Sequence, residues 1–197
     1  MAELEIFSLH GFLGRPEEVQ QGEAIDYFRI PELSPEVTLA DWGRAFNLFI
    51  KKRSRLKVCS TRRKLRGYSL GGRLALHAFQ EDPEFWSEVE LLSTHPGFGS
   101  ETEREARLRQ DEIWARRFDR RDDNLEDWES LMRDWNSQPV FAGSAEKTRR
   151  EEDYDRSQLA LALRHWSLGC QRDFRGFLSA HRSQWQVYTG SLDLKFT

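Results

Sequence analysis

The chain has 197 residues, which fits one domain, or one domain with an insertion, and allows a sizeable hydrophobic core. Charged residues make up 32% of it, but seven tryptophans and thirteen phenylalanines argue against a disordered chain. The formal net charge of -3 gives no overall attraction to nucleic acid or to an anionic membrane, so neither is expected as a partner.

Hydrophobic spacing predicts strands that alternate with helices and then give way to a long helical stretch. The expected strands are residues 4–9, 24–30, a segment leading into Gly67, 89–93 and 185–189. The expected helices are residues 38–50 with Thr38 as cap, a helix from Ser69 onward, 101–135, and the region around 146–168. This order is typical of an α/β fold with a mostly parallel central sheet and a helical lid.

A basic stretch at residues 51–66, KKRSRLKVCSTRRKLR, contains nine Lys and Arg residues and could indicate a nucleic-acid patch. We favour a solvated helix end and loop, because the chain as a whole is negative. Lys64 and Arg66 stay unexplained. They fall where a central parallel strand should run, and such strands are normally apolar on both faces.

The sequence shows neither a targeting segment nor a metal site. The first residues lack the pattern of a signal peptide, and no apolar run approaches the length of a membrane span. Cys59 and Cys170 lack metal-ligand spacing and are interpreted as reduced structural thiols. We expect a soluble, cytoplasmic protein without metal or cofactor, as a monomer or weak homo-oligomer.

The motif G-x-S-x-G occurs in residues 65–76, LRGYSLGGRLAL, where a strand should turn into a helix. A nucleophile elbow needs glycines around its serine, because the turn is tight and strains the serine backbone. Gly67 and Gly71 flank Ser69, and Gly72 allows close packing. Ser69 would then lie at a helix N-terminus, where backbone N–H groups favour developing negative charge.

A second motif, HGFLG at residues 10–14, directly follows the first expected strand. An oxyanion hole uses the N–H after the nucleophile and an N–H from the loop after an earlier strand. Leu70 and Phe12 are the natural backbone donors, and His10 is interpreted as structural. The two motifs in this order favour an α/β-hydrolase fold.

A carboxylate in residues 190–196, GSLDLKF, follows the last expected strand. In this fold the triad acid comes after the lid, since the chain order is Ser, Asp, His. Asp193 is therefore the expected residue that orients a histidine. Taken alone, an Asp after a Gly is usually only a turn residue.

Six stretches together carry a resemblance to a known family: LHGFLG, GYSLGGR, HPGFGSETEREARLRQDEIWARRF, DWNSQPVF, DRS around Arg156, and GSLDLKF. They span most of the chain. They resemble the menaquinone-pathway lyases of the α/β-hydrolase superfamily, the 2-succinyl-6-hydroxy-2,4-cyclohexadiene-1-carboxylate synthases. The resemblance implies a hydrolase core at residues 1–97 and 169–197, with a helical lid at 98–168.

The resemblance also implies a reaction, the elimination of pyruvate from 2-succinyl-5-enolpyruvyl-6-hydroxy-3-cyclohexene-1-carboxylate. It implies that the serine removes a ring proton as a base, while the oxyanion hole stabilises charge on the succinyl carbonyl. A substrate with several carboxylates favours arginine forks. Arg73, four residues after Ser69, can point toward the same mouth. The resemblance adds Arg107 and Arg156 as carboxylate ligands, and Tyr68, Trp135 and Phe141 as pocket walls.

No histidine follows Asp193, whereas the family's catalytic histidine follows one more strand. We therefore expect a truncated or divergent chain that lacks the family's last strand and helix and has impaired turnover. His95 is the best internal substitute, and His77 is expected to be packed in the core. A serine esterase of the same fold, or a non-catalytic remnant that binds polycarboxylates, stays open as an alternative function.

Overall fold

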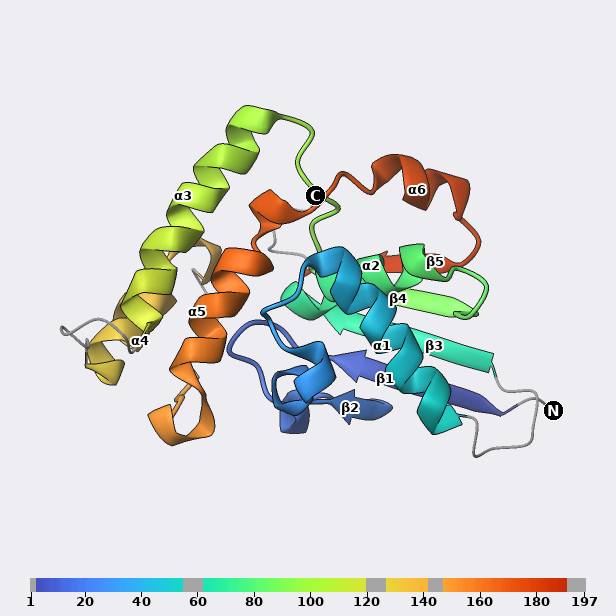
Figure 1. Ribbon diagram of the computed structural model, residues 1–197, viewed down its shortest axis with the longest axis horizontal. Coiled ribbons are helices and arrows are strands. Elements are labelled where there is room, and N and C mark those ends of the chain that lie inside the picture. The colour runs from blue at the N-terminus through green and yellow to red at the C-terminus, as the bar shows by residue number, and fades with distance from the viewer. Residues whose placement is uncertain (1–2, 55–61, 120–126, 142–146, 191–197) are drawn as a thin grey trace.

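Five parallel strands form the sheet at the centre of the computed structural model, which describes residues 3–54, 62–119, 127–141 and 147–190. The strands are β1 (Leu4–Leu9), β2 (Glu23–Ile25), β3 (Arg62–Tyr68), β4 (Glu88–Leu92) and β5 (Trp185–Tyr188). Their order across the sheet is β2-β1-β3-β4-β5 (Figure 1). The predicted α/β class and parallel sheet are confirmed, and all strands except β2 lie where the sequence placed them, to within a residue.

The predicted strand at residues 24–30 is wrong in its extent. β2 ends at Ile25, and short 3-10 helices follow at Tyr27–Arg29 and Pro31–Leu33. Tyr27 is fully buried, stacks on the His10 ring at 4.3 Å, and donates a hydrogen bond to the His10 carbonyl (2.8 Å). These contacts fold the chain back against the end of β1, which a continuing strand could not do.

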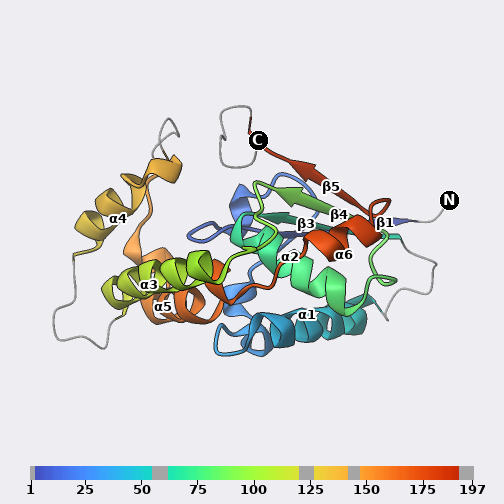
Figure 2. The same ribbon diagram turned by 90° about the horizontal axis from the view of Figure 1, so that it is seen from above.

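Three helices cover one face of the sheet (Figure 2): α1 (Leu39–Ser54), α2 (Leu70–Glu81) and α6 (Arg175–Ala180). Thr38 is the cap of α1 as predicted, since its Oγ1 accepts a hydrogen bond from the Asp41 N–H (3.2 Å). The helix runs on to Ser54, past its expected end at residue 50. The core between sheet and helices is strongly aromatic, and its fully buried members include Trp42, Phe46, Leu65, Leu74, Phe79 and Trp86.

Lys64 and Arg66 form ion pairs with the neighbouring strand, which explains their place in β3. Side chains alternate along a strand, so Leu65 enters the core while its two neighbours lie on the opposite face. Lys64 Nζ lies 2.9 Å from Glu90 Oε1, and Arg66 Nε lies 2.6 Å from Glu90 Oε2. Burial pushes the pKa of Glu90 up, but the two cations together bring it below its usual value. This face of the sheet is therefore charged, and its charges are paired across strands.

The lid lies beyond the carboxyl ends of the strands (Figure 1). It consists of α3 (Glu101–Phe118), α4 (Trp128–Asn136) and α5 (Arg156–His165). These helices enclose a second apolar cluster, which includes Leu13, Trp114, Phe118, Trp128, Leu131, Trp135 and Leu159. The helical prediction for residues 101–135 is confirmed for the described part, with residues 120–126 lying outside it. We keep the division into 1–97, 98–168 and 169–197 as a proposal.

The helical prediction for residues 146–168 is wrong at its start. Helix α5 begins only at Arg156, and the preceding described residues contain one 3-10 turn, Glu151–Asp153. Asp155 sets this boundary, because its side chain accepts a hydrogen bond from the Ser157 N–H (2.9 Å) as a helix N-cap. Residues before the cap are instead used for contacts with other parts of the molecule.

Within the described part, no helix combines the length and the apolar character that crossing a membrane requires. Cys170 is a free, exposed thiol, and Cys59 lies outside the described residues.

Candidate active site

Ser69 occupies the tight turn between β3 and α2. Its backbone has φ +52° and ψ -111°, and positive φ is a region that residues other than glycine rarely adopt. The Ser69 N–H donates to the Leu92 carbonyl at the end of β4 (2.9 Å), which ties the turn to the adjacent strand. A strained serine held at the start of a helix has the geometry of a nucleophile elbow.

The glycines around Ser69 are required by close approaches of the backbone. A Cβ atom on Gly67 would lie 2.4 Å from the Gly71 carbonyl oxygen. A Cβ atom on Gly71 would lie 2.4 Å from the Leu9 carbonyl oxygen. A side chain at either position would collide with backbone, so the glycines let α2 begin directly against the ends of β1 and β3.

The loop at residues 10–14 approaches Ser69 from β1, the neighbour of β3 in the sheet. A Cβ atom on Gly11 would lie 3.5 Å from the Ser69 Cβ. Among the described residues, nothing accepts a hydrogen bond from the Phe12 N–H. The Leu70 N–H belongs to the first turn of α2, where helical amides have no partner within the helix. Two unbonded amides therefore flank the serine turn.

Arg73 lies one helical turn after Ser69 and is buried at the junction of core and lid. Its Nη1 donates to the carbonyl of Trp166, just after α5 (2.7 Å). Burial and then the charge of Arg107 lower the pKa of Arg73 to about 10, and Asp111 opposes this shift. Arg73 is therefore still protonated at neutral pH.

Arg107 is held on the lid by a buried carboxylate. Its Nε donates to Asp111 Oδ1 (2.8 Å), one turn further along α3. The other carboxylate oxygen accepts from Ser167 Oγ (2.7 Å), whose oxygen in turn accepts from the Gly169 N–H (2.9 Å). Asp111 is thus the anionic centre of a network that joins the lid arginine to the segment returning to the core.

The three predicted wall residues lie in different settings. Trp135 is buried in the lid cluster, with its ring centroid 5.0 Å from that of Phe12. Phe141 is half-buried, and its ring lies 6.1 Å from Trp135. Tyr68 is 53% exposed, and its ring covers Gly11 so closely that a Cβ there would lie 2.9 Å from Tyr68 Cδ1. Trp135 and Tyr68 thus both adjoin the loop that carries Phe12.

Arg156 lies inside the lid, where only 1% of it is exposed. Its Nε donates to the Phe118 carbonyl (3.2 Å) and its Nη2 to the Arg117 carbonyl (2.9 Å), at the C-terminus of α3. Its Nη1 lies 3.4 Å from Glu151 Oε1. A substrate carboxylate would have to compete with these partners for the guanidinium, and so its role as a ligand stays a prediction.

Each of the five histidines has contacts of its own. The contacts join His10 to the Gly11 carbonyl, His95 to the Gly97 N–H, His165 to the Pro35 carbonyl, His181 to the Phe177 carbonyl, and His77 to the ring of Phe174. No hydrogen bond within the described part joins a histidine to Ser69. Burial of His77 in the core is confirmed. Asp193 lies outside the described residues, and its role stays a prediction.

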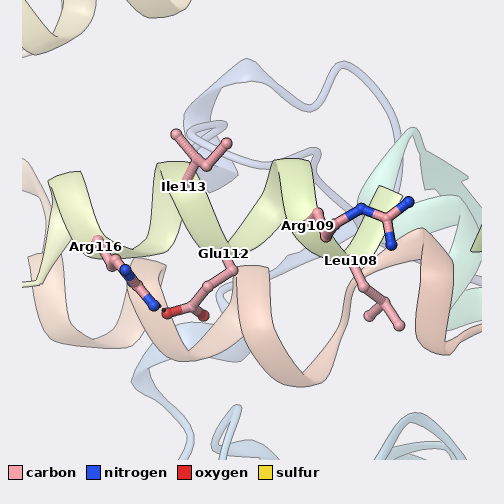
Figure 3. A pocket seen from close by; sticks show the side chains of 5 residues that line it. All are labelled: Leu108, Arg109, Glu112, Ile113 and Arg116. Atoms are coloured by element: carbon pink, nitrogen blue, oxygen red, sulfur yellow. Dashed lines mark hydrogen bonds and ion pairs between the residues drawn. The ribbon is translucent and has the colours of Figure 1, made fainter. Parts of the chain in front are cut away.

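An open surface hollow lies along α3 (Figure 3). It is lined by Leu108, Arg109, Glu112, Ile113 and Arg116. Glu112 and Arg116 pair within it (3.0 Å), and none of the predicted site residues takes part. Within the described residues, no cluster of histidine, cysteine and acidic side chains could hold a metal ion.

Sequence reasoning missed the residues that hold the arginines and the loop in place. Asp111 could have been found as an acidic partner four residues after Arg107, the spacing of a helical ion pair. Ser167 and Trp166 give no local signal, because their contacts to α3 and α2 depend on the return of the chain from the lid.

The parallel sheet, the strained serine between β3 and α2, and the helical lid define the α/β-hydrolase fold. Solved structures agree on the fold. MenH from S. aureus matches with a TM-score of 0.76 at 20% identity, over 98% of this chain and 77% of that one. A thermophilic esterase from Thermogutta terrifontis matches with a TM-score of 0.57 at 15% identity, over 96% and 72%.

Curated sequences are closer. The 2-succinyl-6-hydroxy-2,4-cyclohexadiene-1-carboxylate synthase of Escherichia coli is 33% identical over 201 residues, which cover 95% of this chain and 77% of that protein. The synthase of Citrobacter koseri is 33% identical over 199 residues, with the same coverage. No family model matches the sequence. The chain belongs to the family of 2-succinyl-6-hydroxy-2,4-cyclohexadiene-1-carboxylate synthases, and its fold is that of the α/β-hydrolases.

Proposed function

We propose that the chain eliminates pyruvate from 2-succinyl-5-enolpyruvyl-6-hydroxy-3-cyclohexene-1-carboxylate and yields 2-succinyl-6-hydroxy-2,4-cyclohexadiene-1-carboxylate, a step of menaquinone biosynthesis. The observation that carries this proposal is the juxtaposition of Ser69 with Arg73, one helical turn away and electrostatically coupled to Arg107. The names of the curated relatives support the same reaction.

In the proposed mechanism, Ser69 acts as a base. Its Oγ, after passing its own proton to an acceptor, takes a proton from the substrate ring. The electrons of that C–H bond, at the ring carbon that carries the succinyl group (C2), form a double bond between C2 and C3. The electrons of the existing 3,4 double bond move to C4–C5, and the C5–O bond to the enolpyruvyl group breaks with its electron pair leaving on the oxygen. The leaving group takes up a proton and is released as pyruvate. No acyl-enzyme forms, so the serine is required to act as a base and not as a nucleophile.

Negative charge spreads onto the succinyl carbonyl during proton removal. We assign its stabilisation to the N–H groups of Phe12 and Leu70, the two unbonded amides beside the serine turn. Fixed donors of this kind strengthen as charge develops and need no reorganisation. They would therefore lower the barrier for proton removal more than they strengthen binding of the substrate.

The carboxylates of the substrate would be bound by arginines. Arg73 and Arg107 carry two positive charges, and Asp111, which pairs with Arg107 (2.8 Å) and also acts on the charge of Arg73, supplies one negative charge. That balance leaves one positive charge to be matched by a bound carboxylate. Arg156 is retained as a proposed third ligand, and Tyr68, Trp135 and Phe141 as proposed walls.

Asp193 is proposed as the acid that orients the proton acceptor of Ser69. None of the five histidines is assigned as that acceptor, because no hydrogen bond within the described part joins a histidine ring to Ser69. We therefore expect turnover well below that of an enzyme with a complete triad. The direct test is release of pyruvate from the enolpyruvyl substrate, followed through NADH consumption by lactate dehydrogenase. Absence of pyruvate release above background would refute the proposal.

A serine esterase activity is a second candidate, because the strained backbone of Ser69 also suits a nucleophile. Covalent labelling of Ser69 by a fluorophosphonate together with turnover of simple esters would favour it over the lyase. A remnant that only binds polycarboxylates would show neither activity but would still bind them through Arg73, Arg107 and Arg156.

A further inference from the structure

The segment 147–154, which we call the lid strap, lies against the loop at residues 10–14, which we call the oxyanion loop. Two donors of the strap meet one acceptor of the loop. Arg149 Nε donates to the Leu13 carbonyl (3.2 Å), and Tyr154 Oη donates to the same oxygen (3.0 Å). Leu13 is 1% exposed and has φ +55°, a conformation that residues other than glycine rarely adopt.

The strap donors are themselves fixed by the lid. Arg149 Nη1 donates to Asn136 Oδ1 (3.0 Å), at the end of α4. The indole N–H of Trp128 donates to the Arg149 carbonyl (2.7 Å), and the Trp128 ring stacks on Tyr154 at 5.5 Å. The lid therefore fixes the orientation of both side chains that donate to Leu13.

Two ion pairs flank these hydrogen bonds. Arg15 Nη1 lies 2.8 Å from Asp153 Oδ2, and Lys147 Nζ lies 2.6 Å from Glu18 Oε2. Both join the strap to the residues just after the oxyanion loop. Their side chains are partly exposed, so they contribute less than the buried contacts at Leu13.

A chain of two peptide planes links the Leu13 carbonyl to the Phe12 amide. A trans peptide is planar, so fixing the Leu13 carbonyl also fixes the direction of the Gly14 N–H. That N–H donates to the Gly11 carbonyl (2.9 Å). The Gly11 carbonyl, which His10 Nδ1 also contacts (2.9 Å), shares the peptide plane between residues 11 and 12 with the Phe12 N–H and points the opposite way. The Phe12 N–H is therefore oriented by the strap contacts together with His10.

We propose that Arg149 and Tyr154 are positioning residues, which hold the Phe12 N–H in the orientation required of an oxyanion donor. The left-handed conformation of Leu13 is unfavourable by itself, and the strap contacts offset its cost. The inference rests on the proposed function, since it gives the Phe12 N–H its role in stabilising the charge that develops on the substrate.

The test compares a Tyr154→Phe, Arg149→Met double variant with wild type. The control is Lys147→Met, which removes a contact of the same strap without touching Leu13. We expect kcat of the double variant to fall about tenfold with KM within about twofold, because a misaimed donor weakens transition-state stabilisation more than binding. The control should match wild type in both constants.

Hydrogen exchange of the Gly14 amide supplies a second measurement that does not depend on activity. The double variant should exchange this amide about tenfold faster than wild type, and the control should not. Unchanged exchange, or faster exchange with an unchanged kcat, overturns the inference. If the wild-type chain releases no pyruvate, the proposed function fails instead, and the Gly14 exchange rate alone decides whether the strap orients the loop.

Discussion

Arg73 of α2 donates a 2.7 Å hydrogen bond to the carbonyl of Trp166, the residue that follows α5 of the lid. This contact joins the helix that carries Ser69 to the segment where the chain leaves the lid. The neighbouring residue, Ser167, binds Asp111 of α3 (2.7 Å). The proposed base and the proposed carboxylate ligands are therefore held in one connected frame, although they come from distant parts of the sequence.

Asp111→Ala should destabilise the protein. The substitution leaves Arg107 and the buried Ser167 hydroxyl without their shared acceptor, which costs about 1–3 kcal/mol in the free energy of unfolding. Urea unfolding measures this. The matched control is Glu105→Ala on the same helix, which removes an exposed pair with Arg109 and should cost less than about 0.5 kcal/mol. Equal losses in the free energy of unfolding would show that the Asp111 network stabilises the protein no more than an exposed ion pair does.

Arg107→Lys should weaken substrate binding. Lysine keeps the charge but loses the planar fork that binds a carboxylate with two hydrogen bonds, so we expect KM to rise about tenfold while kcat changes little. Arg109→Lys, on the exposed side of α3, is the control and should leave both constants unchanged. A fall in kcat at constant KM would instead place Arg107 in transition-state stabilisation.

Glu90→Gln should destabilise the sheet at neutral pH by about 1–3 kcal/mol, because Lys64 and Arg66 lose their common anion. The pKa of Glu90 lies below its usual 4.5 in the folded state. Its stabilising contribution is thus complete above pH 4.5 and disappears as the pH falls through the folded value. The free energy of unfolding of wild type should therefore lose this contribution as the pH falls in the acid range, whereas the variant lacks the contribution at every pH. Glu84→Gln, an exposed substitution, should leave the free energy of unfolding unchanged.

His77 should make the protein sensitive to mild acid. Burial, with a smaller effect of Arg73, lowers the pKa of His77 to about 3, whereas the unfolded chain takes up this proton near pH 6.5. Stability is therefore full above pH 6.5 and falls toward pH 3, by about 1.4 kcal/mol per pH unit. His77→Leu should flatten urea-unfolding stability between pH 6.5 and pH 4.5, the part of this range that lies above the loss of the Glu90 contribution. The control variant Glu90→Gln should keep the slope of stability against pH in this window. If the slope also survives in His77→Leu, it belongs to another titrating group.

Imidazole added to the assay should accelerate pyruvate release if no histidine of the chain serves Ser69. A free base can then accept the serine proton, and a general base is worth at least about tenfold in rate. The acceleration should increase with the concentration of neutral imidazole and be absent in Ser69→Ala. A rate that imidazole leaves unchanged would mean that a group of the chain already acts as the acceptor.

The sequence predicted those parts of the site that depend on local geometry. Gly67 and Gly71 indicate the elbow because a side chain at either position collides with backbone, and such a constraint is visible in the sequence itself. The cap at Thr38 is equally local. These features need no knowledge of which segments meet in space.

Features that depend on long-range pairing could not be predicted. Lys64 and Arg66 look out of place in a central strand until the register brings β4 beside them, with Arg66 opposite Glu90. The second strand ends early because Tyr27 packs on His10, a contact that spacing alone does not reveal. The strap residues Arg149 and Tyr154 likewise show no motif, since their acceptor at Leu13 is remote in the sequence.

The most direct test of the account is pyruvate release by the wild-type chain and by Ser69→Ala, each assayed with the enolpyruvyl substrate in the presence of imidazole. We predict release above background by wild type and a loss of at least about a hundredfold in the variant, because the proposed base is gone. Folding of the variant is checked by urea unfolding. Equal release by the two proteins, or release by neither, would contradict the assignment of Ser69 as the base of a pyruvate-eliminating lyase.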